Sequence, residues 1–440
     1  MLSSCLLVFS ADVGERVRYA CSVLLKECAG IDFELTNDDD FFKKSTQPRL
    51  SYHTHRLSSD ECFVPSYGLL AERHVAPQTF IVAQSDGLPA FFFVPNTQNA
   101  DFSFDLLALA FYLVSRYEEY LPTASFDAHR RFSAAASLAS QHHFLHLPLV
   151  NLWALKLRAR LQQRFPELTV APPRFQCQPT YDIDMAWAFR HKGFWRTAAS
   201  VANDLLRGRL QNFFQRVAVQ WFLQNDPYDT FASLDKLHKS HQSAPIYFFL
   251  VGDYDGKYDK NISFRSPAFR QLIQSVAAKY EVGLHPSYQS NENKTLVAVQ
   301  KQRLEEIIGL KVTRSRQHFL KLSLPSTYQQ LLANKIYTDF SMGYAEAIGF
   351  RASVAVPFFW YDLTSESVTN LKIHPFCAMD VTLRNYLKLS PQAALGELRA
   401  LKAATEQVGG TFSFIWHNSS FYTSEGWAGW AATHEQIQAK

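Results

Sequence analysis

The sequence predicts an α/β protein of two domains, of which the second contains a parallel sheet, either open or closed into a barrel. Its 440 residues exceed what a single hydrophobic core usually organises. A proline-rich stretch, residues 166–173, marks the boundary, because prolines interrupt periodic segments. Beyond it, short apolar strands alternate with helical patterns, as in parallel sheets with helical crossovers. We therefore expect an N-terminal α/β domain over residues 1–165 and a barrel domain over residues 174–440.

The N-terminal part mixes strand-like and helix-like segments. An apolar strand leads into a helix whose apolar residues recur at helical spacing and whose end is marked by Gly30. Two strand-like runs flank the turn sequence Ser-Asp-Gly, which is typical of a hairpin. The expected elements are a strand over 5–10, helices over 14–30, 102–121 and 147–165, and hairpin strands over 78–84 and 88–94.

Six short segments after the boundary are strand candidates, and helical patterns such as residues 294–309 lie between several of them. Six such strands in about 240 residues suit a barrel of the TIM type. The expected strands are residues 177–184, 244–252, 280–286, 311–317, 336–341 and 410–417.

The composition limits the classes of function. Hydrophobic residues make up 47% and charged residues 19%, which is typical of a globular chain. The net charge of +4 is too small to indicate nucleic-acid binding, and no zinc-finger or RNP-type motif supports it. Six cysteines without a CxxC pair indicate thiols in a reducing compartment. With no signal-peptide pattern and a longest apolar run of only nine residues (106–114), we expect a cytoplasmic protein without a transmembrane segment.

Polar side chains follow the expected strands at their carboxyl ends, where parallel α/β folds place their reacting groups. Asp182 and Asp184 lie two residues apart, and alternate residues of a strand share a face, so both carboxylates point the same way. Two like charges so close are costly unless a cation lies between them or one takes a proton. The other candidates are His285 with Ser287 and Gln289, Arg316 with His318, Asp339, and His417 with Asn418.

Each member alone has an ordinary structural explanation. The aspartates could cap a helix, His285 could belong to a loop, and His417 could be a satisfied core histidine. Five strand ends that converge on Asp, His and Arg are better explained by a site. Metal-assisted hydrolysis fits these residue types, because a divalent ion bound by carboxylate and imidazole polarises a carbonyl and activates a water. A neighbouring carboxylate can act as base, and a histidine across the pocket can protonate the leaving group.

Five short motifs follow one another in the second part. They are TYDID at 180–184, HPSYQ at 285–289, RQHF at 316–319, YTDFSMGY at 337–344 and FIWHN at 414–418. Their order resembles that of the polysaccharide deacetylase family (NodB homology, carbohydrate esterase family 4), and the whole layout resembles a divergent bacterial two-domain branch of it. The resemblance implies a distorted (β/α) barrel of NodB type after a smaller α/β domain. It also implies an enzyme that removes N- or O-acetyl groups from sugars with a divalent metal, zinc first among the candidates.

The resemblance also assigns roles to individual residues. Asp182 would be the catalytic base, oriented by Arg316, and His417 would be the general acid. Asp184 and His285 would be metal ligands. Residues expected to contact the substrate are Ser287, Gln289, Asp339 and Asn418.

This chain departs from the family pattern in three places. The inserted Ile183 separates the two aspartates, so which of them is base and which is ligand stays open. Gln289 stands where the family has its second metal histidine, and His318, at an adjacent strand end, is the candidate replacement. In the last motif, Asn418 replaces an aspartate.

The expected substrate is an acetylated sugar or glycolipid. Alternatives are another amide or ureide hydrolase on the same barrel, or a degenerate deacetylase that binds carbohydrate without turnover. Residues 190–216 interleave basic and aromatic residues on an expected helix, which could make a peripheral contact with an anionic membrane, although such stretches are more often solvated helix faces. Asp127, His129 and Arg131 are expected in a salt-bridge cluster at the domain interface.

Overall fold

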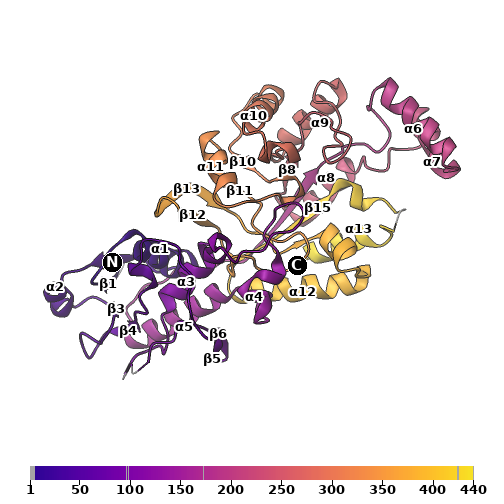
Figure 1. The fold of residues 1–440 in the computed structure, drawn as a ribbon. Coiled ribbons are helices and arrows are strands. Elements are labelled where there is room, and N and C mark those ends of the chain that lie inside the picture. The colour runs from indigo at the N-terminus through magenta and orange to yellow at the C-terminus, as the bar shows by residue number, and fades with distance from the viewer. Residues whose placement is uncertain (1–4, 96, 98, 172, 424–425, 440) are drawn as a thin grey trace.

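The computed structural model describes residues 5–439 apart from 96, 98, 172, 424 and 425. Two α/β parts pack side by side, the first drawn in indigo to magenta and the second mostly in orange and yellow (Figure 1). The expected fold class is confirmed: a distorted (β/α) barrel follows a smaller α/β unit. Between residues 165 and 175 the described residues form no helix or strand, and we propose the domain boundary there.

The N-terminal part is built on a four-stranded parallel sheet with the order β2-β1-β3-β4. Strand β1 (Leu6–Ser10) is buried at every residue, as parallel strands covered on both faces require. The other strands are β2 (Phe33–Thr36), β3 (Arg49–His53) and β4 (Cys62–Pro65), with a separate hairpin of β5 (Ala83–Ser85) and β6 (Leu88–Ala90). The expected first strand and hairpin are therefore present, whereas β2, β3 and β4 have no counterpart in the sequence prediction.

Helices cover this sheet. Among them α3 is buried at every residue, and its first turn is capped by Asp105, whose carboxylate accepts hydrogen bonds from the backbone N–H of Ala108 and the hydroxyl of Tyr52. The helices of this part are α1 (Glu15–Cys21), which continues into a π-helical turn (Ser22–Cys28), α2 (Asp39–Lys44), α3 (Leu106–Val114), α4 (Leu138–Gln141) and α5 (Leu149–Arg164).

The second part contains a nine-stranded sheet with the order β12-β13-β11-β10-β9-β8-β7-β15-β14. Neighbours are parallel except β12 and β13. The strands are β7 (Gln176–Ile183), β8 (Ile246–Phe249), β9 (Glu281–Leu284), β10 (Arg314–Ser315), β11 (Thr338–Asp339), β12 (Phe358–Asp362), β13 (Ser367–Ile373), β14 (Ala378–Met379) and β15 (Thr411–His417). The six strands expected from the sequence are six adjacent strands of this sheet, and β12, β13 and β14 extend it at its two ends.

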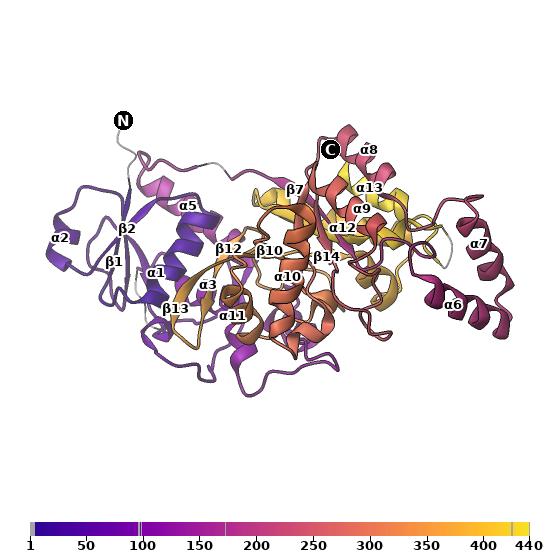
Figure 2. The same cartoon turned by 90° about the horizontal axis from the view of Figure 1, so that it is seen from above.

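The crossover helices lie around this sheet (Figure 2). They are α8 (Phe231–His241), α9 (Pro267–Ala277), α10 (Thr295–Ile308), α11 (Ser326–Ala333) and α12 (Pro391–Gln407), and a last helix, α13 (Trp430–Gln438), follows β15. The expected helix at 294–309 is α10. Within the described ranges, no helix combines the length and apolar character needed to cross a bilayer.

One expected helix is wrong in its extent. Residues 190–216 do not form a single helix but belong to a hairpin of α6 (Phe194–Leu206) and α7 (Leu210–Gln220). Gly208 between them has a φ of +64°, a left-handed conformation that ends a helix and that glycine adopts without steric cost.

A buried ion cluster joins the two parts. Glu119 accepts hydrogen bonds from Arg116 (2.7 Å) and from Nε and Nη2 of Arg351 (3.0 and 2.7 Å). Arg116 also donates to the backbone oxygen of Arg351. All three side chains are buried, so their charges must be satisfied within the protein, and Glu118 adds a second carboxylate beside Arg116 (2.7 Å). The cluster fixes the N-terminal part against the barrel.

Candidate active site

The carboxyl ends of β7, β9, β10 and β15 meet at one cavity of about 160 Å³. A cavity of about 150 Å³ can hold a benzene-sized group, so this one can admit a small acyl group or part of a sugar ring. Its lining includes both charged and apolar side chains. The lining residues are Arg131, Asp182, Asp184, His285, His318, Phe319, Leu320, Ala345, Met379, Val381, Tyr386 and His417.

Asp182 is held by a buried arginine. It is the second-last residue of β7, and its Oδ1 accepts a hydrogen bond of 2.8 Å from Nη1 of Arg316, which directly follows β10. Arg316 also donates from Nε to the backbone oxygen of Phe340 (3.0 Å), and its guanidinium carbon lies 4.5 Å from the ring centroid of Phe248. Arg316 is fully buried, so Asp182 is its charge partner inside the protein.

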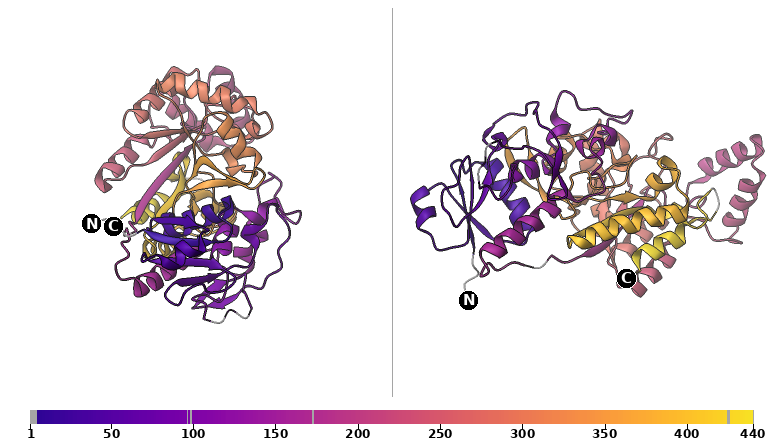
Figure 3. Two further views of the ribbon diagram at one scale, coloured as in Figure 1. Left: turned by 90° about the vertical axis from the view of Figure 1, so that its left-hand side faces the viewer. Right: turned by 90° about the horizontal axis from the view of Figure 1, so that it is seen from below.

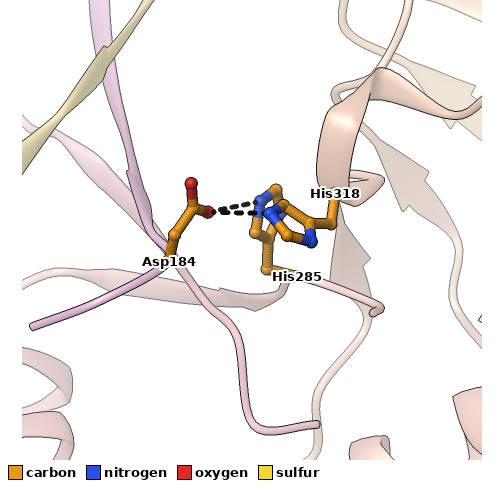
Figure 4. Close-up of side chains that lie close together, drawn as sticks. All are labelled: Asp184, His285 and His318. Atoms are coloured by element: carbon orange, nitrogen blue, oxygen red, sulfur yellow. Dashed lines mark ion pairs between the residues drawn. The ribbon is translucent and has the colours of Figure 1, made fainter. Parts of the chain in front are cut away.

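Asp184, His285 and His318 point toward one another from three different segments (Figure 4). Oδ1 of Asp184 lies 3.2 Å from Nε2 of His285 and 3.6 Å from Nε2 of His318. The three potential ligand atoms all lie within 4.8 Å of one another. One carboxylate oxygen and two imidazole nitrogens form the donor set of many catalytic metal sites, which keep further positions open for water or substrate.

The outer nitrogens of both histidines are already engaged. Nδ1 of His285 lies 2.6 Å from the backbone oxygen of Arg316, and Nδ1 of His318 lies 2.9 Å from Oδ1 of Asp259. Such partners fix the ring orientation and turn Nε2 toward the centre, as they do for metal-ligating histidines. Oδ1 of Asp184 is buried and, within the described part of the chain, accepts no hydrogen bond of regular geometry. The residues present therefore fit a divalent cation.

The electrostatics of the cluster fit the same conclusion. Burial alone would raise the pKa of Asp184, but His318 and His285 hold it well below its usual value. Burial would lower the pKa of His318, but Asp184 and Asp259 outweigh it and raise the pKa to about 9. The pocket thus stabilises positive charge beside Asp184.

His417 faces the cluster from the end of β15. Its Nε2 lies 3.7 Å from Oδ2 of Asp184, and its Nδ1 lies 2.8 Å from Oδ1 of the fully buried Asp380. The backbone N–H of His417 donates to Oδ2 of Asp380 (2.7 Å). Burial opposes protonation of His417, but Asp380 outweighs it, and the pKa rises to about 10. His417 therefore carries a proton at neutral pH.

The remaining four predicted residues lie outside the cavity lining. Ser287 and Gln300 hydrogen-bond through their side chains (2.7 Å), and Gln289 donates to Asp255 (3.3 Å). The other two are also held within the protein: Asp339 accepts from Ser315 and Ser341, and Asn418 donates to the backbone oxygens of Met185 and Tyr228. Their contact with substrate stays a prediction.

Two residues of the site, Asp380 and Asp259, are not predicted from the sequence. Asp380 follows the two-residue strand β14, which is too short to give a periodic signal. Asp259 lies in the loop between β8 and α9, away from the expected strand ends, yet it accepts from the backbone N–H of Tyr288 (2.8 Å) as well as contacting His318. An aspartate directly after a short apolar run was the available signal for Asp380.

The N-terminal part also reaches the cavity. Arg131 pairs with Asp127 (Nε to Oδ2, 2.7 Å), donates to the backbone oxygen of Phe319 (2.9 Å) and approaches the hydroxyl of Tyr386 (3.4 Å). Nδ1 of His129 lies 3.0 Å from the hydroxyl of Tyr288. The expected salt-bridge cluster is thus present between the two parts, and Arg131 additionally lines the site.

Comparison with known proteins gives limited similarity. Residues 6–166 match the model of a family of unknown function, DUF7033. No curated protein matches the chain. Among solved structures, a provisionally named polysaccharide deacetylase from Mycobacterium smegmatis aligns at 14% identity over 61% of this chain and 86% of that chain, with a TM-score of 0.38.

Two Bacillus structures align less closely. A CE4 family pseudoenzyme from Bacillus anthracis aligns at 9% identity over 60% of this chain and 63% of that chain, with a TM-score of 0.29. A polysaccharide deacetylase from Bacillus cereus aligns at 12% identity over 60% of this chain and 86% of that chain, also with a TM-score of 0.29. Sequence identities and TM-scores this low carry no information about function, so the function is inferred from the geometry of the site alone.

Proposed function

We propose that the chain is a metal-dependent hydrolase that removes an acetyl group from an acetylated sugar or glycolipid. The observation that carries this proposal is the convergence of Asp184, His285 and His318 beside an arginine-held aspartate and an aspartate-held histidine. A divalent ion held by these three residues, zinc being our first candidate, would polarise the acetyl carbonyl and lower the pKa of a water.

The protein residues then have separate tasks. Asp184 lies nearest both imidazoles and serves as ligand, whereas Asp182 is oriented by Arg316 and serves as general base. His417, protonated through its contact with Asp380, donates a proton to the leaving oxygen or nitrogen. These contacts favour this division of roles between the two aspartates, which the sequence leaves open.

The apolar wall supports a small acyl substituent. Leu320, Ala345, Met379 and Val381 line the cavity as one apolar cluster and can accept a methyl group without leaving a polar atom unsatisfied. A methyl group gains only about 1 kcal/mol from such burial, so the wall positions the acetyl group and excludes water more than it adds affinity.

The direct test is release of acetate from a panel of acetylated sugars by the zinc-loaded protein. We expect turnover by the wild type, a loss of about 10³-fold or more in kcat for Asp182→Asn, and wild-type activity for the matched control Asp40→Asn, an exposed aspartate on α2. Turnover of cyclic amides or ureides but not of sugars would identify a different hydrolase. Tight sugar binding without acetate release would identify a binding module, and either result would refute the proposal.

A further inference from the structure

The hairpin of α6 and α7 stands away from the rest of the molecule. It projects at the end of the barrel opposite the N-terminal part (Figures 1 and 2, and Figure 3, right). The two helices pack chiefly on each other. Their attachment includes a hydrogen bond from Arg196 to the backbone oxygen of Asn261 (2.8 Å) and one from Gln215 to the hydroxyl of Tyr422 (2.6 Å).

The free face of this hairpin is apolar. Of the 22 exposed large hydrophobic side chains among the described residues, nine lie between positions 194 and 223, far more than a segment of this length should contain by chance. Trp195 is 82% exposed and Leu206 is 87% exposed. The nine are Phe194, Trp195, Leu205, Leu206, Leu210, Phe214, Trp221, Phe222 and Leu223.

These side chains fall at helical spacing. On α6 the exposed positions 195, 198, 199, 202 and 206 are Trp, Ala, Ala, Ala and Leu, which lie on one face. On α7, Leu210 and Phe214 are one turn apart, and Trp221, directly after the last helical residue, lies a further seven residues along. Each helix therefore presents a continuous apolar stripe to the outside.

The inner side of the hairpin buries a charged pair as well as the apolar Val219. Asp204 on α6 and Arg216 on α7 form a buried ion pair (2.9 Å) between the two helices. In a hairpin surrounded by water, the aromatic and leucine side chains would pack inward and the ion pair would lie outside. The observed arrangement is the reverse, so the exposed face is suited to an apolar surrounding.

The net charge of the segment indicates which kind of apolar environment the exposed face fits. Residues 190–223 contain six Lys or Arg and one Asp, a net charge of +5, whereas the rest of the chain has 38 basic and 39 acidic residues, a net charge of −1. Two of these cations, Arg207 and Arg209, are exposed at the turn between the helices. Aromatic and leucine residues beside arginines are typical of helices that lie in the interface of an anionic bilayer.

We propose that the α6–α7 hairpin is a docking surface for an anionic lipid bilayer. The apolar stripes insert among the acyl chains and the arginines contact headgroup phosphates. A second copy of the chain fits the surface less well, because two hairpins of net charge +5 would repel each other. This inference does not depend on the proposed hydrolase activity.

Vesicle flotation tests the proposal with the full-length protein. We expect the wild type to float with phosphatidylglycerol-rich vesicles at low ionic strength but not with phosphatidylcholine vesicles. Replacing two inserted rings with Trp195→Asp and Phe222→Asp should lower the partition coefficient by about tenfold or more. Replacing two cations with Arg207→Gln and Arg209→Gln should lower it by about tenfold, with a weaker dependence on salt.

The matched control is Ile81→Asp, an equally exposed apolar residue (78%) on the N-terminal part, which should bind vesicles like the wild type. Two results with the wild type alone would overturn the proposal. They are absence of flotation at low ionic strength and equal flotation with both vesicle types. A loss in the Ile81→Asp control as large as in the hairpin variants also overturns it. So does a hairpin-dependent dimer in sedimentation velocity without lipid, because that result assigns the surface to a second copy.

Discussion

Replacing Arg316 with methionine should destabilise the barrel strongly. Among the described residues, Arg316 carries the only charge within hydrogen-bonding distance of Asp182, and the change removes it. The change also removes the hydrogen bond that Arg316 donates to the backbone oxygen of Phe340. Asp182 and Arg316 have side chains that are only 4% and 0% exposed, so water cannot take over the lost partner. Breaking a buried ion pair on one side costs about 3–5 kcal/mol, and we expect Arg316→Met to lower the free energy of unfolding by about 4 kcal/mol at pH 7.

A double-mutant cycle separates the interaction energy of Asp182 and Arg316 from the general cost of losing either side chain. In the Arg316→Met background, Asp182→Asn removes the uncompensated charge, so it should cost far less than in the wild type. The expected coupling energy is at least about 2 kcal/mol. The measurement is urea unfolding in EDTA, so that no cation replaces the arginine.

The chain offers a matched control two residues earlier. Arg314 pairs with Glu281 at 2.8 Å, but the two side chains are 35% and 53% exposed, so Arg314→Met should cost less than about 1 kcal/mol. A loss below about 1 kcal/mol for Arg316→Met, or additive effects of the two site variants within about 0.5 kcal/mol, would refute the reasoning.

Three further predictions concern other groups. Glu119→Gln should lower the free energy of unfolding by about 3–5 kcal/mol in urea denaturation, because it leaves Arg351 buried without a full counter-charge; a loss under about 1 kcal/mol would contradict the cluster. Asp380→Asn should lower kcat for acetate release by about 10²-fold or more with little change in KM, because His417 loses the carboxylate that keeps it protonated; an unchanged kcat would remove His417 from the mechanism. Burial lowers the pKa of His238 to about 4, so between pH 6.5 and 4 the unfolded chain binds a proton that the folded chain does not. Stability should therefore fall with falling pH by about 1.4 kcal/mol per unit from this group, and His238→Gln should flatten the pH dependence of urea unfolding; an unaltered slope would contradict the assignment.

The sequence predicts the centre of the barrel well and its margins poorly. Strands β7 (eight residues) and β15 (seven residues) are long, and Asp or His lies at the carboxyl end of each, so both the strands and these site residues are visible in the sequence. Strand β14 has two residues and carries no alternation, which is why Asp380 is missed. Strands β2 and β4 have four residues each, too few for a period to stand out.

Tertiary contacts explain the other differences. The α6–α7 segment has a continuous helical pattern, but Gly208 divides it into two helices. A glycine within such a pattern is the sequence signal for a break between helices. The contribution of Arg131 to the cavity depends on how the N-terminal part packs on the barrel, which no local pattern encodes. The position of His318 beside Asp184 was predictable because adjacent parallel strands end at the same edge, and its role as the second metal histidine stays a prediction.

Equilibrium dialysis against Zn²⁺ tests the central claim, that Asp184, His285 and His318 form one metal site, most directly. The account predicts one tightly bound ion per chain and an affinity lowered by at least ~100-fold in His318→Ala, with no change in the exposed control His55→Ala. Zinc that fails to bind the wild type, or that binds His318→Ala as tightly, would contradict it.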